Sequence, residues 1–329
     1  MPPPNPPTPP ILLFGYDSSL FTQKARLALR LLRLPSTLIR VPPRPPRPLL
    51  LRPFALPYRK IPVLAVGRDL YVDTALIAAV LDARFASGAA TLFPDKQVAP
   101  LARLWAATCA DRPLFRVMTG LVPGRVWRAR FGVDRGRLVG HALDAAKLAA
   151  KRPRNVAALD AWLSAVEGRF ADGGGGWLFG AGAAPGWADV ALWEQLEWGV
   201  GVAGGRGVGD LTGGEEGDGG GEVAEGENGE GRGLVGRVWN EGRYPGLWRW
   251  FEAFRAYVEA LPVEEERVEG SEEEKMRVVV ERLGACGECG LRESMMKTSA
   301  VGEGGVDELI GLVPGAEVVI APDDTGKDE

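Results

Sequence analysis

Residues 16–26 read YDSSLFTQKAR and join two elements of different kinds. Ahead of them, residues 11–16 form a short apolar run, which predicts a buried strand. Behind them, residues 20–34 carry apolar side chains at helical spacing, and the serines before this run are typical helix N-cap residues. The sequence therefore predicts a strand that leads directly into a helix headed by hydroxyl groups.

More strands and a second helix follow directly. Residues 38–41, 61–66 and 70–72 favour strands, the last two as a hairpin, and residues 75–85 predict a helix. Residues 42–48, PPRPPRP, fit neither a helix nor a central strand and predict a rigid loop. This order of strands and helices is that of one small α/β layer.

Beyond residue 100 the helical pattern dominates. Helices are expected over residues 101–110, 136–152, 155–170, 188–199 and 247–261. An all-helical unit is therefore expected after the α/β layer.

The composition along the chain predicts four parts. These are a proline-rich arm at residues 1–10, the α/β domain at 11–95, the helical domain at 96–262, and an acidic, mostly irregular tail or truncated extra domain at 263–329. Within the helical domain, residues 204–233 are rich in glycine and acidic side chains. They bury too little apolar surface to offset their ordering entropy, so a disordered insertion is expected there.

The composition excludes several classes of protein. The chain has 329 residues, of which 46% are hydrophobic and 25% charged, so it is not wholly disordered. No run of about 18 apolar residues exists, so no transmembrane helix is expected, and the proline-rich start lacks a signal-peptide pattern. Three cysteines argue against a disulfide-built secreted fold and favour a reducing, cytoplasmic location.

Charge is distributed unevenly. Residues 1–160 hold 25 Lys and Arg against 9 Asp and Glu, whereas residues 161–329 hold 14 against 34. A basic half can bind nucleic acid or a small anion. A solvated basic surface is the simpler interpretation, and nucleic-acid binding ranks third among the hypotheses because no aromatic residues are interleaved with the basic ones.

Five residues are candidates for chemistry, and each also has an ordinary structural explanation. Ser18 and Ser19 either cap the first helix or stabilise an anion, such as a thiolate, at its N-terminus. Pro62 either opens an edge strand or forms a cis bond that leaves the preceding backbone free to pair with a peptide-like ligand. Asp73 and Thr74 either cap the next helix or hold an ammonium group and a carboxylate at its start.

Metal and redox sites have little support in the sequence. Cys286 and Cys289 form a single CxxC, with neither a second pair nor a suitably placed histidine. Cys109 lies alone upstream, and His141 is the only histidine. No metal is therefore expected.

Taken together, these motifs resemble the glutathione S-transferase family. The resemblance rests on SLFTQKAR at residues 19–26, IPVL at 61–64, DT at 73–74, and WLFG followed by WADVALW at 177–180 and 187–193. It covers residues 11–262 apart from the insertion. It implies a thioredoxin-like N-terminal domain, which binds glutathione, followed by an all-helical C-terminal domain.

The resemblance also implies conjugation of glutathione, as co-substrate, to a small electrophile. Ser19 falls where serine-type members place the hydroxyl that stabilises the glutathione thiolate, and Ser18 is the alternative. A hydroxyl at a helix N-terminus lowers the pKa of the thiol, and the thiolate attacks the electrophile. A homodimer is a further expectation from the family.

Five other residues receive a binding role from the resemblance. Ile61, ahead of a cis Pro62, matches the residue whose backbone pairs with the cysteine of glutathione. Asp73 and Thr74 match the pair that holds the γ-glutamyl end, where Glu or Gln with Ser is commoner. Lys60 is a candidate for the glycine carboxylate.

Three points stay open in the sequence. Trp105, Phe115, Met118 and Trp127 either line a pocket for the electrophile or belong to the helical core. Gly186 stands where a capping Ser or Thr is usual, so that helix start is expected to be weaker by a few tenths of a kcal/mol. The rival hypothesis is a non-catalytic binding or adaptor protein with the same fold, which the tail, the insertion and the proline-rich loop favour.

Overall fold

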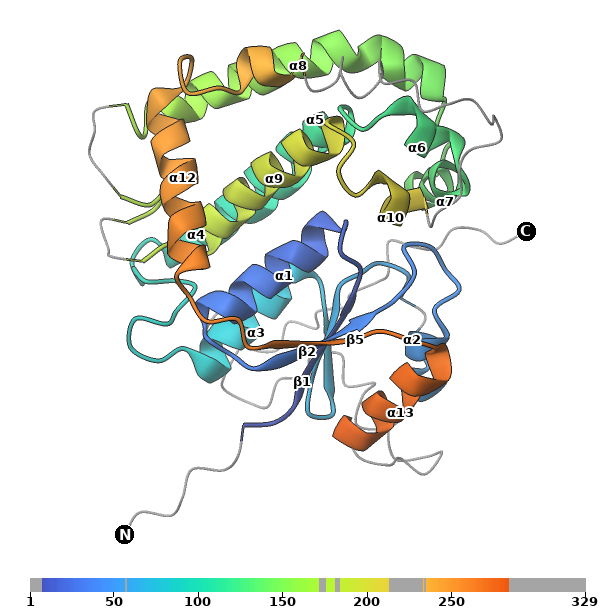
Figure 1. Cartoon of the computed structure of the whole chain (residues 1–329). Helices are drawn as coiled ribbons and strands as arrows, with labels where there is room; N and C mark the ends of the chain where they lie inside the picture. The colour runs from blue at the N-terminus through green and yellow to red at the C-terminus, as the bar shows by residue number, and fades with distance from the viewer. Residues whose placement is uncertain are drawn as a thin grey trace, which may run out of the picture.

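The computed structural model of the protein describes residues 8–56, 58–171, 176–180, 184–212, 233 and 235–283. Figure 1 shows the sheet and its own helices in the lower half of the molecule and a unit of helices in the upper half. Within the described part of the chain, no helix is both long and apolar enough to cross a bilayer. Most of the predicted proline-rich arm, and both Cys286 and Cys289, lie outside the described residues.

One mixed sheet has the strand order β4-β3-β1-β2-β5. Its strands are β1 (Ile11–Gly15), β2 (Ser36–Arg40), β3 (Val63–Val66), β4 (Asp69–Val72) and β5 (Glu265–Val268). Strands β1 and β2 run parallel, while β3 is antiparallel to both β1 and β4. The first four strands and their helices form the predicted thioredoxin-like domain, and β5 adds to it from the far end of the chain.

Helices cover both faces of this sheet. Helices α1 (Leu20–Leu31) and α3 (Thr74–Phe85) lie on the face toward the helical unit, and α2 (Pro48–Phe54) lies on the other (Figure 1). Successive side chains of a strand point to opposite faces. Accordingly, Leu13 of β1 packs in the core with α1, while Leu12 and Phe14 pack in the core with α2.

Residues 42–47 form a loop, and helix α2 follows them, where the sequence predicted no helix. Leu49, Leu50 and Phe54 are buried against the sheet, and this burial outweighs the poor helical pattern of the segment. Pro48 stands at the first helical position, where a missing N–H costs nothing.

The second unit is helical, as predicted. Its helices are α4 (Ala99–Trp105), the π-helix η1 (Ala106–Leu114), α5 (Phe115–Thr119), α6 (Gly124–Arg128), α7 (Arg130–Val139), α8 (Ala145–Glu167), α9 (Trp187–Ala203), α10 (Val208–Thr212) and α12 (Pro245–Glu259). The helix expected over residues 136–152 is wrong. Gly140, with φ of 78°, ends α7, and Asp144 caps α8, which continues through Pro153.

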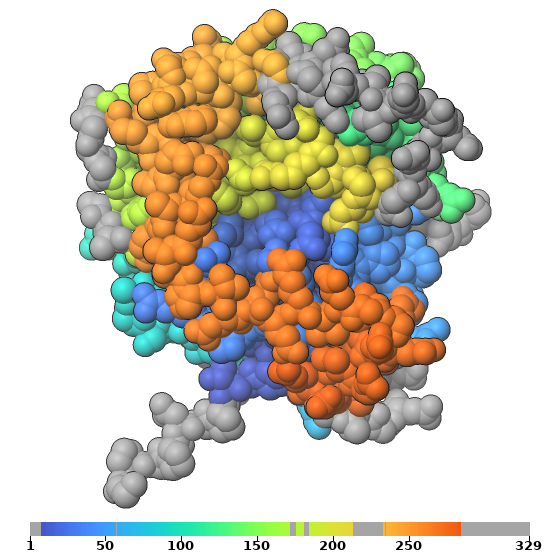
Figure 2. All heavy atoms as spheres, viewed as in Figure 1, coloured from blue at the N-terminus to red at the C-terminus, as the bar shows by residue number. Residues whose placement is uncertain are grey.

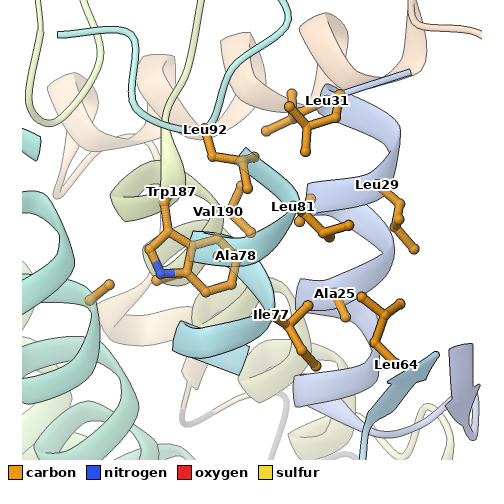
Figure 3. Packing of buried hydrophobic residues seen from close by; sticks show 14 of the residues in the cluster. Ala25, Leu29, Leu31, Leu64, Ile77, Ala78, Leu81, Leu92, Trp187 and Val190 are labelled. Carbon is orange, nitrogen blue, oxygen red and sulfur yellow. The ribbon is translucent and has the colours of Figure 1, made fainter. Parts of the chain in front are cut away.

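The two units share one core. Figure 3 shows Trp187, at the start of α9, lying among side chains of α1 and α3 that include Ala25, Ile77 and Ala78. Trp187 is 1% exposed. The buried ring of Trp187 thus holds α9 against α1 and α3.

A buried ion pair lies in the same interface. The Lys24 side chain on α1 is fully buried, and its Nζ donates to both carboxylate oxygens of Asp111, each at 2.6 Å. Asp111 belongs to the π-helix η1. The ammonium also lies 4.7 Å from the ring centroid of Trp187, a cation–π distance. Charge and packing therefore join the two units at one place.

A buried carboxyl lies on α9, which packs against α1. Burial raises the pKa of Glu194 well above its ordinary value, Glu197 adds to the rise, and Arg206, Lys24 and Arg26 oppose it. The unfolded chain loses this proton at the ordinary pKa, and the folded protein only at higher pH. Between these two values the folded state binds more protons, so its stability falls as the pH rises.

We predict that Glu194→Gln flattens this fall in stability. The amide keeps the shape of the side chain and cannot ionise, so the variant becomes more stable than the wild type toward the upper end of the pH window. Urea unfolding of both proteins across a pH series from 4 upward, in about half-unit steps, measures the difference. Glu252→Gln, at an exposed ion pair on α12, is the control. Parallel curves for the wild type and Glu194→Gln would contradict the prediction.

The C-terminal segment returns to the sheet. Strand β5 pairs in parallel with β2, and α13 (Glu272–Leu283) packs against α2 through Val279 and Leu283. In Figure 2 this segment crosses the front of the N-terminal domain. Residues 265–283 thus differ from the mostly irregular tail expected there, because β2 offers an open edge and the α2 face offers apolar surface.

Candidate functional site

The strand register brings three of the predicted segments to one end of the sheet. Phe14 of β1 pairs with Val63 of β3, and Val63 pairs with Val72 of β4. Residues 16–19 follow β1, residues 60–62 precede β3, and residues 73–74 follow β4. The starts of α1 and α3 therefore lie at the same end of the sheet as the start of β3.

Ser19 is the N-cap of α1. Its Oγ accepts a hydrogen bond from the amide of Thr22 at 3.2 Å, and the residue is 6% exposed. One lone pair of the hydroxyl thus serves the cap, while its proton can be donated to an anion. Ser18 has a buried Oγ with no hydrogen-bond partner among the described residues.

The start of β3 holds the next three predicted residues. The Ile61–Pro62 peptide bond is cis, Pro62 is buried and Ile61 is half-buried. Lys60 is exposed. This segment therefore presents an ammonium group to solvent and a partly buried backbone at the end of the sheet.

Asp73 and Thr74 lie at the start of α3. Asp73 has φ of 72°, in the left-handed region that non-glycine residues seldom adopt. Its carboxylate accepts from the amide of Ala75 at 2.8 Å and is exposed, whereas Thr74 is 5% exposed. The backbone here is held in an uncommon conformation, and the exposed carboxylate of Asp73 caps α3.

Helix α10 closes over the loop before Ser19 (Figure 1). The amide of Ser18 donates to Asp210 Oδ2 at 2.8 Å, and Trp198 Nε1 donates to the carbonyl of Ser18 at 2.8 Å. Arg40 at the end of β2 donates to Asp210 Oδ1 at 2.5 Å. Burial raises the pKa of Asp210, but the hydrogen bonds from Ser18 and Arg40 outweigh it and leave the pKa below its ordinary value. Asp210 is thus an anion that the loop already binds.

This helix corrects the expectation that residues 204–233 are a disordered insertion. Residues 204–212 are ordered, because Val208 and Leu211 of α10 are buried against Tyr16 and Val202. Residues 213–232 lie outside the described part of the chain.

Residues 13–89 match the family model described as "Glutathione S-transferase, N-terminal domain". Residues 13–89 thus resemble the N-terminal domain of glutathione S-transferases. The matched residues contain every residue to which the sequence assigned a catalytic or glutathione-binding role. They also contain α1, α2, α3 and the first four strands apart from the start of β1.

Solved structures resemble the chain as well. A GST-like protein from Pseudomonas syringae is 22% identical, with 84% of this chain and 75% of that one covered and a TM-score of 0.48. A Tau class glutathione S-transferase from mango, Mangifera indica, is 18% identical, with coverage of 84% and 99% and a TM-score of 0.47. A rice glutathione S-transferase, solved in complex with glutathione, is 19% identical, with coverage of 76% and 98% and a TM-score of 0.41. No curated protein matches the chain.

An apolar cluster adjoins residues 16–19, the serine loop. Its buried members are Tyr16, Val122, Val126, Phe131, Val202, Val208 and Leu211, and Ile61, Trp127 and Trp198 pack against it. We name it the cleft cluster. It joins Tyr16 and Ile61 to helices of the second unit beside the three converging segments. Its seven members are at most 6% exposed, so the half-buried Ile61, Trp127 and Trp198 are its parts that reach solvent.

The four aromatic and methionine candidates of the helical unit divide between the cleft and the core. Met118 is fully buried in the helical core, and Trp105 packs there against Trp162 and Phe179. Trp127 packs against the cleft cluster, and Phe115 packs between Phe21 and Trp198. Only Phe115 and Trp127 are therefore placed to meet a ligand beside the serine loop.

The second-domain motif forms a buried network around Asp189. Its Oδ1 accepts from the amide of Leu178 at 2.7 Å and from Trp250 Nε1 at 2.8 Å, and its Oδ2 accepts from the amide of Gly186 at 3.0 Å. Burial raises the pKa of Asp189 above its ordinary value. The start of α9 is thus held by a carboxylate from inside the helix.

Close packing explains why a glycine stands at position 186, which the sequence did not reveal. A Cβ atom there would lie 3.1 Å from the carbonyl oxygen of Leu92 and 3.2 Å from Pro94 Cδ. A capping Ser or Thr would therefore press on the backbone of the 92–94 segment.

Polar groups are available on two of the three converging segments. Thr74 at the start of α3 and Lys60 ahead of β3 offer a hydroxyl and an ammonium group for carboxylates, and the exposed Asp73 offers a partner for an ammonium group. Among the described residues, no group of three or more His, Cys, Asp or Glu is arranged to hold a metal ion.

Sequence reasoning missed Asp210, Arg40 and Trp198, which surround Ser18. The glycine-rich composition after residue 203 obscured α10. The local signal was the spacing of Val208 and Leu211, three residues apart around Asp210, which suits one face of a short helix.

Proposed function

We propose that the protein conjugates glutathione to a small electrophile, with Ser19 stabilising the thiolate. Ser19 donates a hydrogen bond to the sulfur at the N-terminus of α1, where the helix dipole also favours negative charge. The backbone of Ile61, ahead of Pro62, pairs with the cysteine of the tripeptide. Asp73 and Thr74 hold its γ-glutamyl end, and Lys60 holds its glycine carboxylate.

One observation supports this proposal above the others. The register Phe14–Val63–Val72 brings the serine loop, the start of β3 and the start of α3 to one end of the sheet. These segments carry all seven proposed residues, and they all lie within the stretch that matches the glutathione S-transferase N-terminal domain.

We predict that Ser19→Ala lowers the kcat/KM for thiol conjugation tenfold or more, as expected for the loss of a charge-assisted hydrogen bond of about 1.5–3 kcal/mol. Activity with an activated aryl chloride and glutathione gives the rate. The ultraviolet absorbance of the thiolate as a function of pH gives the pKa of bound glutathione, which rises in the variant.

Two controls accompany this measurement. Loss of the cap costs about 1 kcal/mol of stability, so urea unfolding of Ser19→Ala establishes that the variant is folded under assay conditions. Ser18→Ala is the matched neighbour and separates the two hydroxyls. Unchanged turnover in Ser19→Ala would remove Ser19 from the mechanism, and an equal loss in Ser18→Ala alone would transfer the role to Ser18.

The alternative is a binding or adaptor protein with this fold and without turnover. The contacts from Asp210 and Trp198 to Ser18 favour it, because they occupy the backbone of the loop that would face the thiol. Calorimetric titration with glutathione decides between the two: binding with a pKa shift of the thiol supports the enzyme, and no binding supports the alternative.

The proposal includes a homodimer and a cytoplasmic location. The mass of the purified protein in sedimentation establishes or excludes the dimer. The cytoplasm is kept reducing by glutathione itself, which agrees with a chain that contains few cysteines.

A further inference from the structure

Three arginines from different segments meet beside the serine loop. Asp134 on α7 bridges two of them: Arg59 Nη2 donates to its Oδ1 at 2.6 Å, and Arg135 Nη1 donates to its Oδ2 at 2.5 Å. The third, Arg47 at the start of α2, donates to the carbonyls of Pro42, Pro43 and Arg59. We name Arg47, Arg59 and Arg135 the arginine cluster.

Burial and mutual repulsion destabilise the positive charge of the arginine cluster. Arg47 is 4% exposed, and burial followed by the charge of Arg135 lowers its pKa to about 10, although Asp134 acts in the opposite direction. Like charges at partly buried positions repel one another strongly because water screens them poorly. A second anion at this place would relieve the repulsion.

The cluster is within reach of a ligand. The side chains of Arg59 and Arg135 are 27% and 22% exposed, so both guanidinium groups meet solvent. A guanidinium has five N–H donors in a fork that suits a carboxylate. Contacts to Asp134, Tyr16 and Pro43 therefore do not exhaust the donors of Arg135.

The cluster is continuous with the cleft cluster. The guanidinium of Arg135 lies 4.4 Å from the ring centroid of Phe131 and donates to the hydroxyl of Tyr16 at 3.3 Å. Tyr16 and Phe131 both belong to the cleft cluster, as does the packing side chain of Ile61. Cationic groups thus adjoin the half-buried apolar side chains of Ile61, Trp127 and Trp198 beside the serine loop.

We propose that Arg59 and Arg135 bind the carboxylate of an electrophile whose apolar body lies against Ile61, Trp127 and Trp198, the half-buried side chains that pack on the cleft cluster. This inference rests on the proposed transferase function and names the substrate class of that site: small aromatic or aliphatic carboxylates. With an aryl chloride, the sulfur of the thiolate forms the new C–S bond, and chloride leaves with the electron pair of the C–Cl bond. The thiol proton has already passed to solvent.

A matched pair of electrophiles tests the carboxylate. These are 4-chloro-3,5-dinitrobenzoate and 4-chloro-3,5-dinitrobenzamide, which share the reacting carbon and differ in charge. Each kcat/KM is divided by the uncatalysed rate with glutathione to remove the intrinsic difference in reactivity. The wild type is expected to prefer the benzoate about tenfold or more, as one charge-assisted pair provides.

Variants then locate the preference. Arg135→Gln is expected to lower the benzoate-to-benzamide ratio about tenfold, and Asp134→Asn is expected to raise it because a competing carboxylate is lost. Arg243→Gln is the matched control, since Arg243 makes a similar pair with the exposed Asp160 far from the cleft. A ratio in Arg135→Gln equal to that of Arg243→Gln overturns the proposal.

The carboxylate of glutathione is the other source of the same chemistry. If Arg135→Gln raises the KM for glutathione equally with both electrophiles and leaves their ratio unchanged, the cluster serves glutathione and the proposal is overturned. A protein that turns over neither electrophile is tested by binding instead. Binding is measured by the quenching of tryptophan fluorescence. If the benzoate quenches more strongly than the benzamide, and Arg135→Gln loses this difference, the carboxylate site is supported although the transferase function has failed. Equal quenching by both compounds overturns it.

Discussion

Replacing Lys24 with alanine is expected to lower the free energy of unfolding by about 3–5 kcal/mol. The substitution leaves the carboxylate of Asp111, only 15% exposed, without the ammonium that both its oxygens accept from at 2.6 Å. It also removes the cation that faces the ring of Trp187. Urea unfolding followed by tryptophan fluorescence measures the loss.

Two further variants separate charge from volume in this result. Lys24→Met keeps most of the volume and removes the charge, and adding Asp111→Asn to it is expected to recover part of the loss because no buried charge then remains. Lys96→Ala removes a lysine that is 73% exposed and pairs with Asp82 at 3.4 Å, and is expected to cost less than about 1 kcal/mol. A loss in Lys24→Ala no larger than in Lys96→Ala would show that the buried pair does not join the two units.

Asp189→Ala has the second large expected effect, a loss of at least about 3 kcal/mol in the free energy of unfolding. Its carboxylate accepts from Leu178, Gly186 and Trp250, and all three donors are left unsatisfied within or beside the core. Each buried unsatisfied donor costs about 1–3 kcal/mol. The ring of Trp250 loses its hydrogen bond, so the change in its fluorescence is a second readout.

Asp144→Ala is the matched control for this loss. Asp144 also caps a helix, accepting from the amides of Ala146 and Lys147, but its cap is exposed to water. Its removal is expected to cost about 1 kcal/mol. Equal losses in the two variants would mean that water replaces the carboxylate of Asp189 as readily as that of Asp144.

The parts of the fold that were predicted are those with local patterns. The strand at residues 11–16 and the following helix were predicted because a short apolar run and helical spacing are visible in the chain itself. Strand β5, with the sequence EERV, has no such pattern: it is a strand only because β2 offers it hydrogen bonds. Helix α2 was missed for the same kind of reason, since its stability comes from burying Leu49, Leu50 and Phe54 on the sheet.

The candidate site divides in a similar way. Ser19, Ile61 and Asp73 are identified by motifs with fixed spacing, and their roles stay predictions until a ligand is bound. Asp210 and Arg135 reach the same place from helices more than one hundred residues downstream of the serine loop. No pattern within the sequence reports that Asp210 accepts from Ser18, because the contact depends on how the helical unit packs on the sheet.

Strand β5 also bears on how the chain folds. Its partner β2 is more than two hundred residues earlier in the sequence. During synthesis on the ribosome, the backbone donors and acceptors along that side of β2 stay without a strand neighbour until nearly the whole helical unit has emerged. The N-terminal domain is therefore synthesised first but completed last. Its final step, the pairing of β5 with β2, closes a loop of more than two hundred residues, and such closure favours slow folding.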